Sequence, residues 1–319
     1  MLYTILKIPA QIVIWFYCRN LLVNKRALFK SNGPILIAAN HPNSFLDAVI
    51  FATLFNKPVY SLARGDAFAN KYHNKILRAT KILPVFRISE GAHNLGQNYT
   101  TFDACKEIFR QNGIVLIFSE GLCVNEWHLR PLKKGTARLA LSCWQDGIPL
   151  KVLPAGINYN AFCSFGKNIQ LNFGEFITQQ EMITEANFGQ IVTSFNQNLQ
   201  QQLGQLVVEL DKNDTAGIEK QFTVSVSPFK KIALFLPAIL GWVLHFPLYI
   251  PLKKYLQKKM PRSDHYDSVL IGILFLSYPF YLLLIFFICM LLTHSWWAVC
   301  CFIALPFTAW SYLQLKKQV

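Results

Sequence analysis

Short apolar runs alternate with amphipathic segments through the first two thirds of the chain, and this alternation predicts strands and helices in turn. Apolar runs bounded by polar or turn residues predict strands at 35–39, 59–62, 82–86, 114–118, 152–157 and 169–173. Apolar positions at helical spacing predict helices between them at 43–54, 67–79, 97–111 and 134–145. Strands that alternate with helices favour an α/β fold, with a mixed, mostly parallel sheet flanked by helices.

A polar, glutamine-rich segment follows the last of these strands. Over residues 179–211 an apolar residue recurs about every four positions, which predicts one amphipathic helix that closes the domain. Residues 212–228 are polar and are interpreted as a linker. The predicted domain therefore covers residues 31–211.

The N-terminal segment is apolar but carries interruptions and an aromatic cluster. Residues 1–23 include Lys7 and Pro9, lack the small-residue cleavage site of a signal peptide, and place Trp15 next to two further aromatic residues. Aromatic and basic side chains suit a membrane interface, and Arg19 suits an anionic headgroup. We expect an interfacial helix within an N-terminal region 1–30, the alternative being a core helix of the domain.

The C-terminal region, 229–319, holds three apolar stretches at 232–252, 269–292 and 296–313. Each is long enough, or nearly so, to cross a bilayer. Basic residues lie on both sides of the first stretch, which also contains prolines, and this pattern predicts a segment that enters and returns on one face. The other two stretches predict a helical hairpin. All basic clusters would then lie on the side of the domain at 31–211, which places that domain on the cytoplasmic face.

Composition supports a membrane protein with anionic partners. The chain has 319 residues, of which 53% are hydrophobic and 14% aromatic, and a formal net charge of +14. Such charge suits an anionic lipid surface or phosphorylated substrates. A nucleic-acid partner is not expected, because the chain has no zinc-finger spacing and no RNA-binding motif. The eight cysteines form no C-x-x-C pair, so we expect reduced thiols, no metal site and no cofactor.

Residues 40–47 read Asn-His-Pro-Asn-Ser-Phe-Leu-Asp and carry the first candidate chemistry. They follow the predicted strand 35–39, and Pro42 suits the first position of a helix. His41 is therefore expected in the strand-to-helix turn, with Asp47 about a turn and a half into the helix. A carboxylate that holds one ring nitrogen of a histidine makes a general base of the other.

Three later segments complete a recognisable series. They are 82–87, Ile-Leu-Pro-Val-Phe-Arg; 116–121, Leu-Ile-Phe-Ser-Glu-Gly; and 152–157, Val-Leu-Pro-Ala-Gly-Ile. With residues 40–47 they resemble the four blocks of the glycerolipid acyltransferases, the family of lysophosphatidate and glycerol-3-phosphate acyltransferases. The resemblance covers roughly residues 30–180. Five residues separate His41 from Asp47 where the family commonly has four, which is similar to a branch that includes fungal glycerol-3-phosphate acyltransferases.

The resemblance implies a role for each block. His41 would be the general base and Asp47 its orienting carboxylate. Glu120 would contact the acceptor's glycerol hydroxyl, Gly121 would let the backbone approach, and Arg87 would clamp the phosphate. The further residues expected to contact substrate are Asn43, Arg130 and Lys133, although a solvated basic face explains the last two equally well.

The leading interpretation is a membrane-bound O-acyltransferase of phospholipid biosynthesis. It would move a fatty acyl group from acyl-CoA or an acylated acyl carrier protein to 1-acylglycerol-3-phosphate or glycerol-3-phosphate. The alternatives are an acyltransferase for another lyso-lipid and a non-catalytic lipid-binding membrane protein on the same fold. A transporter is disfavoured, because the apolar segments are too few for a repeat-built transporter.

Overall fold

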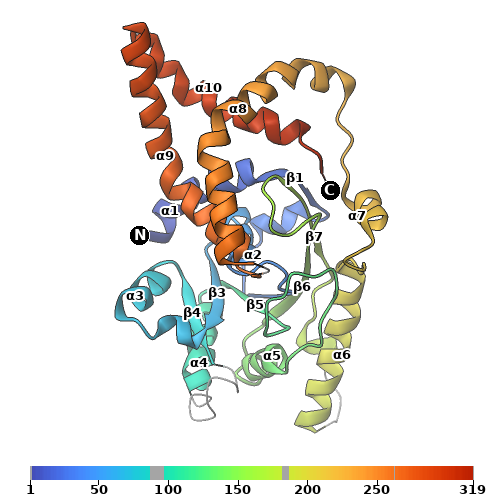
Figure 1. Cartoon of the computed structure of the whole chain (residues 1–319). Helices are drawn as coiled ribbons and strands as arrows, with labels where there is room; N and C mark the ends of the chain where they lie inside the picture. Colours follow the sequence, from blue (N-terminus) through green and yellow to red (C-terminus); the bar gives the residue numbers. More distant parts are fainter. Residues whose placement is uncertain (1, 87–96, 182–186, 262, 319) are drawn as a thin grey trace. The chain divides into compact units, whose positions relative to one another are not determined.

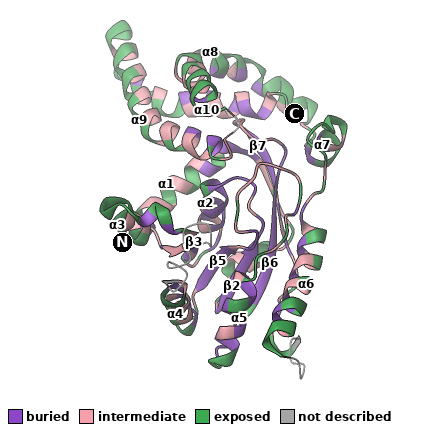
Figure 2. Cartoon of the chain, turned by 60° about the horizontal axis from the view of Figure 1, so that its bottom comes forward, coloured by how far each residue is buried: buried purple, intermediate pink, exposed green. Residues whose placement is uncertain are grey.

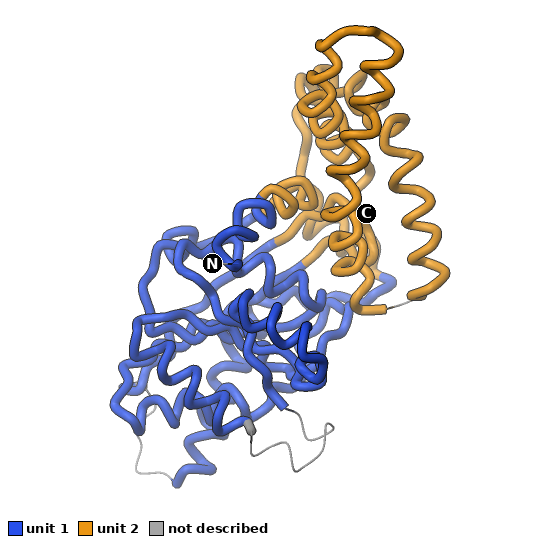
Figure 3. The backbone as a smooth tube through the Cα atoms, turned by 90° about the vertical axis from the view of Figure 1, so that its left-hand side faces the viewer, with its two compact units in different colours: residues 1–11, 22–158, 170–213 blue, residues 12–21, 159–169, 214–319 orange. Residues whose placement is uncertain are grey.

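The computed structural model describes residues 2–86, 97–181, 187–261 and 263–318, and it divides the chain into two compact units (Figure 3). Unit 1 comprises residues 1–11, 22–158 and 170–213, and unit 2 comprises residues 12–21, 159–169 and 214–319. Neither unit is contiguous in the chain. The predicted boundaries at 30, 211 and 228 stay predictions. Each unit combines segments from different predicted regions, so the division into units does not test them.

A seven-stranded sheet forms the framework (Figure 1). Its order is β1-β7-β6-β2-β5-β3-β4, and β2 pairs parallel with β5 and β6, as β3 does with β4 and β5. The strands are β1 Cys18–Val23, β2 Ile35–Ala39, β3 Val59–Arg64, β4 Ile82–Val85, β5 Ile114–Phe118, β6 Lys151–Tyr159 and β7 Lys167–Phe173. The predicted α/β fold with a mostly parallel sheet is confirmed, and six of the seven strands lie where the apolar runs predicted them.

Both faces of the central strands are covered, which is why those strands are apolar throughout. On one face Leu36 and Ala38 of β2 pack in a core with Phe109 and with side chains from the helices that follow. On β2 itself every residue is buried, including Ile35 and Ile37, whose side chains point to the other face. Figure 2 shows the buried strands between more exposed helices.

The helices of the sheet domain are short and locally capped. They are α2 Phe45–Leu54, α3 Lys71–Ala79, α4 Gln97–Arg110, α5 Gly135–Gln145 and α6 Phe188–Leu206, with 3-10 turns η1 Arg26–Lys30, η2 Gly65–Phe68 and η5 Gln179–Glu181. The Asn70 side chain accepts the backbone N–H groups of Tyr72 and His73 at the start of α3. Asn187 and Gln190 form a capping box at the start of α6. These caps satisfy donors that have no partner inside the helix.

Helix α1, Leu2–Tyr17, exposes several apolar side chains, whereas Ile14 and Tyr17 are buried. Tyr3, Lys7 and Gln11 donate hydrogen bonds to backbone carbonyls at the end of α2. Ile5 and Ile8 are 58% and 65% exposed. Exposed apolar side chains on a helix suit the headgroup region of a bilayer, and an interfacial helix stays a prediction from the sequence.

Residues 18–23 do not continue this helix, contrary to expectation, but form edge strand β1. Arg19 is buried and does not face a lipid headgroup: its Nε donates to the carbonyl of Leu313 at 2.6 Å and one Nη to that of Lys316 at 2.6 Å. These carbonyls lie at the end of a C-terminal helix, where a cation is favourable.

Unit 2 contains the apolar C-terminal helices. They are α8 Pro228–Lys259, α9 Tyr266–Thr293 and α10 Cys301–Leu315, the last preceded by the 3-10 turn η6 Trp296–Cys300. Within the described residues three helical segments, Pro228–Lys259, Tyr266–Thr293 and Trp296–Leu315, are long and apolar enough to cross a membrane. The polar segment interpreted as a linker holds a further helix, α7 Thr215–Phe222, with Ile218 and Phe222 buried.

Each end of α8 contacts residues near the end of α10, directly or through Phe165. At its start Lys230 Nζ donates to Gln314 at the end of α10, at 2.7 Å. Towards its end the buried Leu256 packs in a cluster with Phe165, whose carbonyl accepts from Lys316 Nζ at 2.8 Å. Three prolines lie inside α8, and the helix bends along its course (Figure 1).

A buried ion pair lies at the start of α9. Lys167 Nζ and Asp267 Oδ2 are 2.6 Å apart, and the two side chains are 0% and 1% exposed. The ammonium also lies 5.7–5.9 Å from the ring centroids of Tyr17, Tyr159 and Phe162. Hydrogen bonds and aromatic faces offset the free-energy cost of burying a cation. The ion pair links Lys167, the first residue of β7, to the first turn of α9.

Candidate active site

The candidate site forms where two parallel strands end side by side. In the register of β2 and β5, Ala39 is opposite Phe118, so residues that follow the two strands meet at the same edge of the sheet. His41 lies two residues beyond β2, and Glu120 lies two residues beyond β5. Loops beyond the carboxyl ends of parallel strands are the usual position of functional groups in open α/β sheets.

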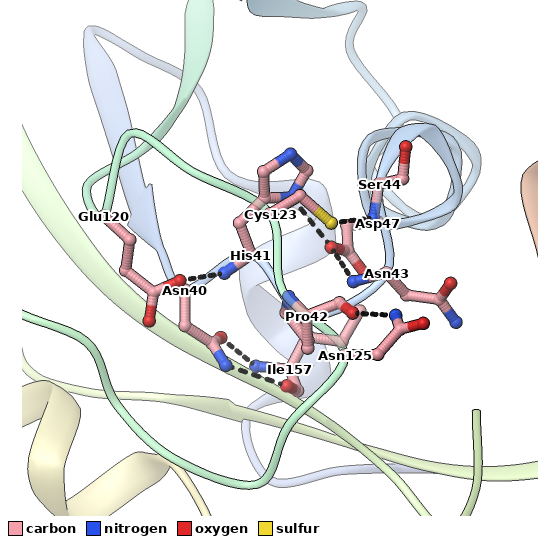
Figure 4. Close-up of polar contacts among 10 residues, drawn as sticks. All are labelled: Asn40, His41, Pro42, Asn43, Ser44, Asp47, Glu120, Cys123, Asn125 and Ile157. Atoms are coloured by element: carbon pink, nitrogen blue, oxygen red, sulfur yellow. Dashed lines mark hydrogen bonds and ion pairs between the residues drawn. The ribbon is translucent and has the colours of Figure 1, made fainter. Parts of the chain in front are cut away.

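His41 and Asp47 form the expected pair (Figure 4). His41 Nδ1 lies 2.9 Å from Asp47 Oδ2, and the same oxygen accepts the backbone N–H of Asn43 at 2.8 Å. The Asp47 side chain is 0% exposed, whereas that of His41 is 16% exposed. Two donors therefore hold a buried carboxylate, and the imidazole turns its Nε2 away from the other residues labelled in Figure 4.

The turn between the pair differs from expectation in detail. Helix α2 begins at Phe45, so Pro42 is not its first residue, and Asp47 lies in the first turn of α2. The spacer is accommodated before the helix, where Ser44 has φ 53° and ψ −140°. A positive φ is unusual for a residue with a side chain, and it bends the chain so that Asp47 can reach back to His41.

Glu120 organises the backbone of the site. Its Oε2 accepts the backbone N–H of His41 at 2.9 Å, and its Oε1 accepts that of Arg130 at 3.0 Å. Burial raises the pKa of Glu120 to about 7, although the hydrogen bonds from Arg130 and His41 oppose that rise. The carboxylate thus joins the loop after β5 to the residue that carries the imidazole.

Two further residues of the site were not singled out from the sequence. The Asn40 side chain donates to the carbonyl of Ile157 at 3.1 Å and accepts its N–H at 2.8 Å, which fixes the end of β2 against β6. Phe118 stacks on the His41 ring, with centroids 3.7 Å apart and planes at 10°. Asn40 belongs to the block that contains His41, and Phe118 to the block that contains Glu120. Their membership of these blocks is the sequence feature that could have identified them.

The remaining candidates surround the pair without all facing it. Gly121 has φ 67°, and a Cβ there would lie 2.9 Å from Lys133 Cγ, so the turn requires glycine. Arg130 directs its guanidinium to Glu126 at 2.8 Å, and Lys133 is exposed. Asn43 is fully buried and helps to shape the turn.

Arg87 lies outside the described residues, so its role stays a prediction from the resemblance. Within the described ranges no group of three or more His, Cys, Asp or Glu side chains could hold a metal ion. The described site is thus an imidazole bonded to a buried carboxylate and surrounded by backbone hydrogen bonds.

The comparisons agree with the sequence blocks. The family model described as Acyltransferase matches residues 20–158. None of the curated proteins matches the chain. Among solved structures, the crystal structure of the 1-acyl-sn-glycerophosphate (LPA) acyltransferase, PlsC, from Thermotoga maritima is similar at 12% sequence identity and a TM-score of 0.41, with 67% of this chain and 77% of that chain covered.

Proposed function

We propose that the chain acylates a hydroxyl of a glycerol phosphate, because its residues 20–158 match the family model described as Acyltransferase and its four blocks resemble the glycerolipid members. The donor would be an acyl thioester, either acyl-CoA or an acylated acyl carrier protein, and the acceptor 1-acylglycerol-3-phosphate or glycerol-3-phosphate. The observation that carries the proposal is the 2.9 Å contact between His41 Nδ1 and the buried Asp47. A histidine held in this way is a base for a hydroxyl group.

The proposed reaction begins with the acceptor hydroxyl within hydrogen-bond distance of His41 Nε2. The imidazole takes the hydroxyl proton as the oxygen attacks the thioester carbonyl. The tetrahedral intermediate then expels the thiolate of the donor, which takes the proton back from the imidazolium. Asp47 fixes the tautomer and stabilises the imidazolium without accepting the proton. No covalent enzyme intermediate is needed.

The surroundings of His41 support this role. Phe118 fixes the ring plane through stacking at 3.7 Å, and Glu120 fixes the backbone of His41 through its N–H. A general base is effective only when it is held within reach of the proton that it removes. For the acceptor phosphate we keep Arg87 as the proposed clamp, with Lys133 as a further source of positive charge.

We further propose that the C-terminal helices anchor the enzyme in the membrane with all basic clusters on one face. In unit 2 the pKa of Lys316 is lowered to about 8, chiefly by burial and then by the charges of Lys253, Arg19 and Lys167. Lys253, near the end of α8, therefore lies within electrostatic reach of Lys316 after α10. Basic residues also precede the apolar stretch of α8, at Lys230 and Lys231, and this pattern supports a helix α8 that enters and returns on one side, which would be the cytoplasmic side by the positive-inside rule.

The function is tested with the full-length protein in lipid nanodiscs. Labelled acyl-CoA and acylated carrier protein are each offered with glycerol-3-phosphate, 1-acylglycerol-3-phosphate and a lyso-lipid that carries a choline headgroup. We expect transfer to one of the first two acceptors. Transfer only to the choline lyso-lipid would move the acceptor to another class. Lipid binding without transfer to any acceptor would favour the non-catalytic interpretation.

A further inference from the structure

The loop after β5 contacts the His41 turn at three successive residues, of which Figure 4 draws Cys123 and Asn125. The backbone N–H of Ser44 donates to Cys123 Sγ at 2.9 Å, and the N–H of Val124 donates to the carbonyl of His41 at 3.3 Å. The side-chain amide of Asn125 donates to the carbonyl of Pro42 at 2.6 Å. We name residues 123–125 the positioning loop, because each of its members bonds a different residue of the turn.

One of these contacts falls on the residue with the least favourable backbone. Ser44 has φ 53° and stands between His41 and Asp47, where the chain must bend to bring the two side chains together. A non-glycine residue keeps such a φ only when its surroundings impose it. The Ser44 N–H is held by Cys123, so this bond is a direct restraint on that conformation.

We propose that the positioning loop aligns the catalytic pair and that Cys123 is a positioning residue, which acts on His41 and Asp47 through Ser44. The inference rests on the proposed acyl transfer and adds to it a residue that bonds Ser44, which lies between the base and the carboxylate in the chain. The sulfur serves as a hydrogen-bond acceptor. It forms no bond with the acyl group, because the acceptor hydroxyl attacks the thioester directly.

The variants separate this role from a general loss of structure. Cys123→Ala removes the acceptor, Cys123→Ser keeps one, and Ser44→Gly supplies a residue that adopts a positive φ without restraint. The matched control is Cys163→Ala, at a partly exposed cysteine outside the site. The charged groups that bond this turn, Asp47 on α2 and Glu120 after β5, stay unchanged in all variants.

We expect Cys123→Ala to lower kcat about 10- to 100-fold, as misplaced catalytic groups do, with KM values for donor and acceptor within about twofold. Its acid limb in the kcat–pH profile should move to lower pH, because Asp47 then stabilises the imidazolium less well. Cys123→Ser should retain most of the activity, and the double variant with Ser44→Gly should regain most of the lost kcat. A reduced fraction of folded enzyme would scale kcat without moving the pH profile.

A readout that needs no acyl transfer separates this inference from the proposed function. Diethyl pyrocarbonate modifies neutral imidazole, and peptide mass spectrometry reports the modification of His41 and of the exposed His73 separately at each pH. In Cys123→Ala the midpoint for His41 should move to lower pH, while that for His73 should not. A shift in a protein that transfers no acyl group would refute the function and leave the positioning role standing.

Three results would overturn the positioning role. Cys123→Ala could match Cys163→Ala in kcat and in pH profile. The double variant could be no more active than Cys123→Ala. An acyl group could also be found on Cys123 after incubation with donor alone, which would make the thiol a nucleophile.

Discussion

The environment of Glu120 predicts a pH-dependent contribution to folding stability that a single substitution can isolate. Its side chain is 4% exposed, and its two oxygens accept the N–H groups of His41 and Arg130. Burial is the largest influence on its pKa and raises it from 4.5 to about 7, with a smaller contribution from the charge of Asp47. Glu120→Gln removes the titrating group at nearly constant volume.

The magnitude follows from the two pKa values. The difference between about 7 in the folded chain and 4.5 in the unfolded chain is about 2.5 pH units, and at about 1.4 kcal/mol per unit it corresponds to about 3 kcal/mol. Between these values the folded chain binds more protons at Glu120 than the unfolded chain does. The contribution is therefore fully present below pH 4.5 and is lost as the pH rises through about 7.

The assay is urea unfolding in detergent micelles, followed by tryptophan fluorescence, for wild type and Glu120→Gln at pH 4.5 and pH 8. The free energy of unfolding of wild type relative to the variant should fall by about 3 kcal/mol between the two pH values. Glu107→Gln, at an exposed position of α4, is the control and should show little change. A relative stability that is constant, or that rises with pH, would show that the buried carboxylate is not destabilised as we argue.

Three further predictions follow from other parts of the structure. Asp47→Asn should lower kcat by about 10²–10⁴-fold with little change in folding, because the imidazole loses its orienting acceptor. Steady-state kinetics measure the loss and circular dichroism checks the folding. A loss in kcat below about tenfold would contradict the prediction. Lys167→Met should lower the free energy of unfolding by about 3–5 kcal/mol, because it leaves a buried charge unpaired. Adding Asp267→Leu should recover most of that loss, because the unpaired charge is then removed as well. Urea unfolding measures both effects, and a double variant less stable than the single variant would contradict the prediction. Reagents that cannot cross sealed vesicles should label Lys254 and Lys317 from the face that carries the domain at 31–211, and labelling of both lysines only from the opposite face would show that α8 crosses the membrane.

The strands could be predicted from sequence because burial on both faces of a sheet leaves a plain signal. The apolar run at 35–39 is β2 to the residue, and the run at 114–118 is β5. Strand β1 could not be predicted in this way, because its residues continue an apolar helix without a change in composition. Its pairing depends on distant residues: the N–H of Asn24, which follows β1, donates to the carbonyl of Leu171 in β7.

The pair of His41 and Asp47 was predictable from residue types and spacing, whereas its support was not. The start of α2 at Phe45 depends on the conformation of Ser44, and that conformation depends on a sulfur 79 positions further along the chain. Glu120 likewise was expected to face substrate, but both of its oxygens hold backbone N–H groups. Such contacts form only when the fold brings two loops together, so local sequence carries little sign of them.

The central claim is that His41 is the base for acyl transfer, and one comparison tests it most directly. Wild type, His41→Ala and His73→Ala are assayed with labelled acyl thioester and the acceptor that wild type uses, after circular dichroism has shown that all three are folded. We expect His41→Ala to lose about 10²–10⁴-fold in kcat and His73→Ala, altered at an exposed residue of α3, to match wild type. Activity of His41→Ala within a few-fold of wild type would contradict the account.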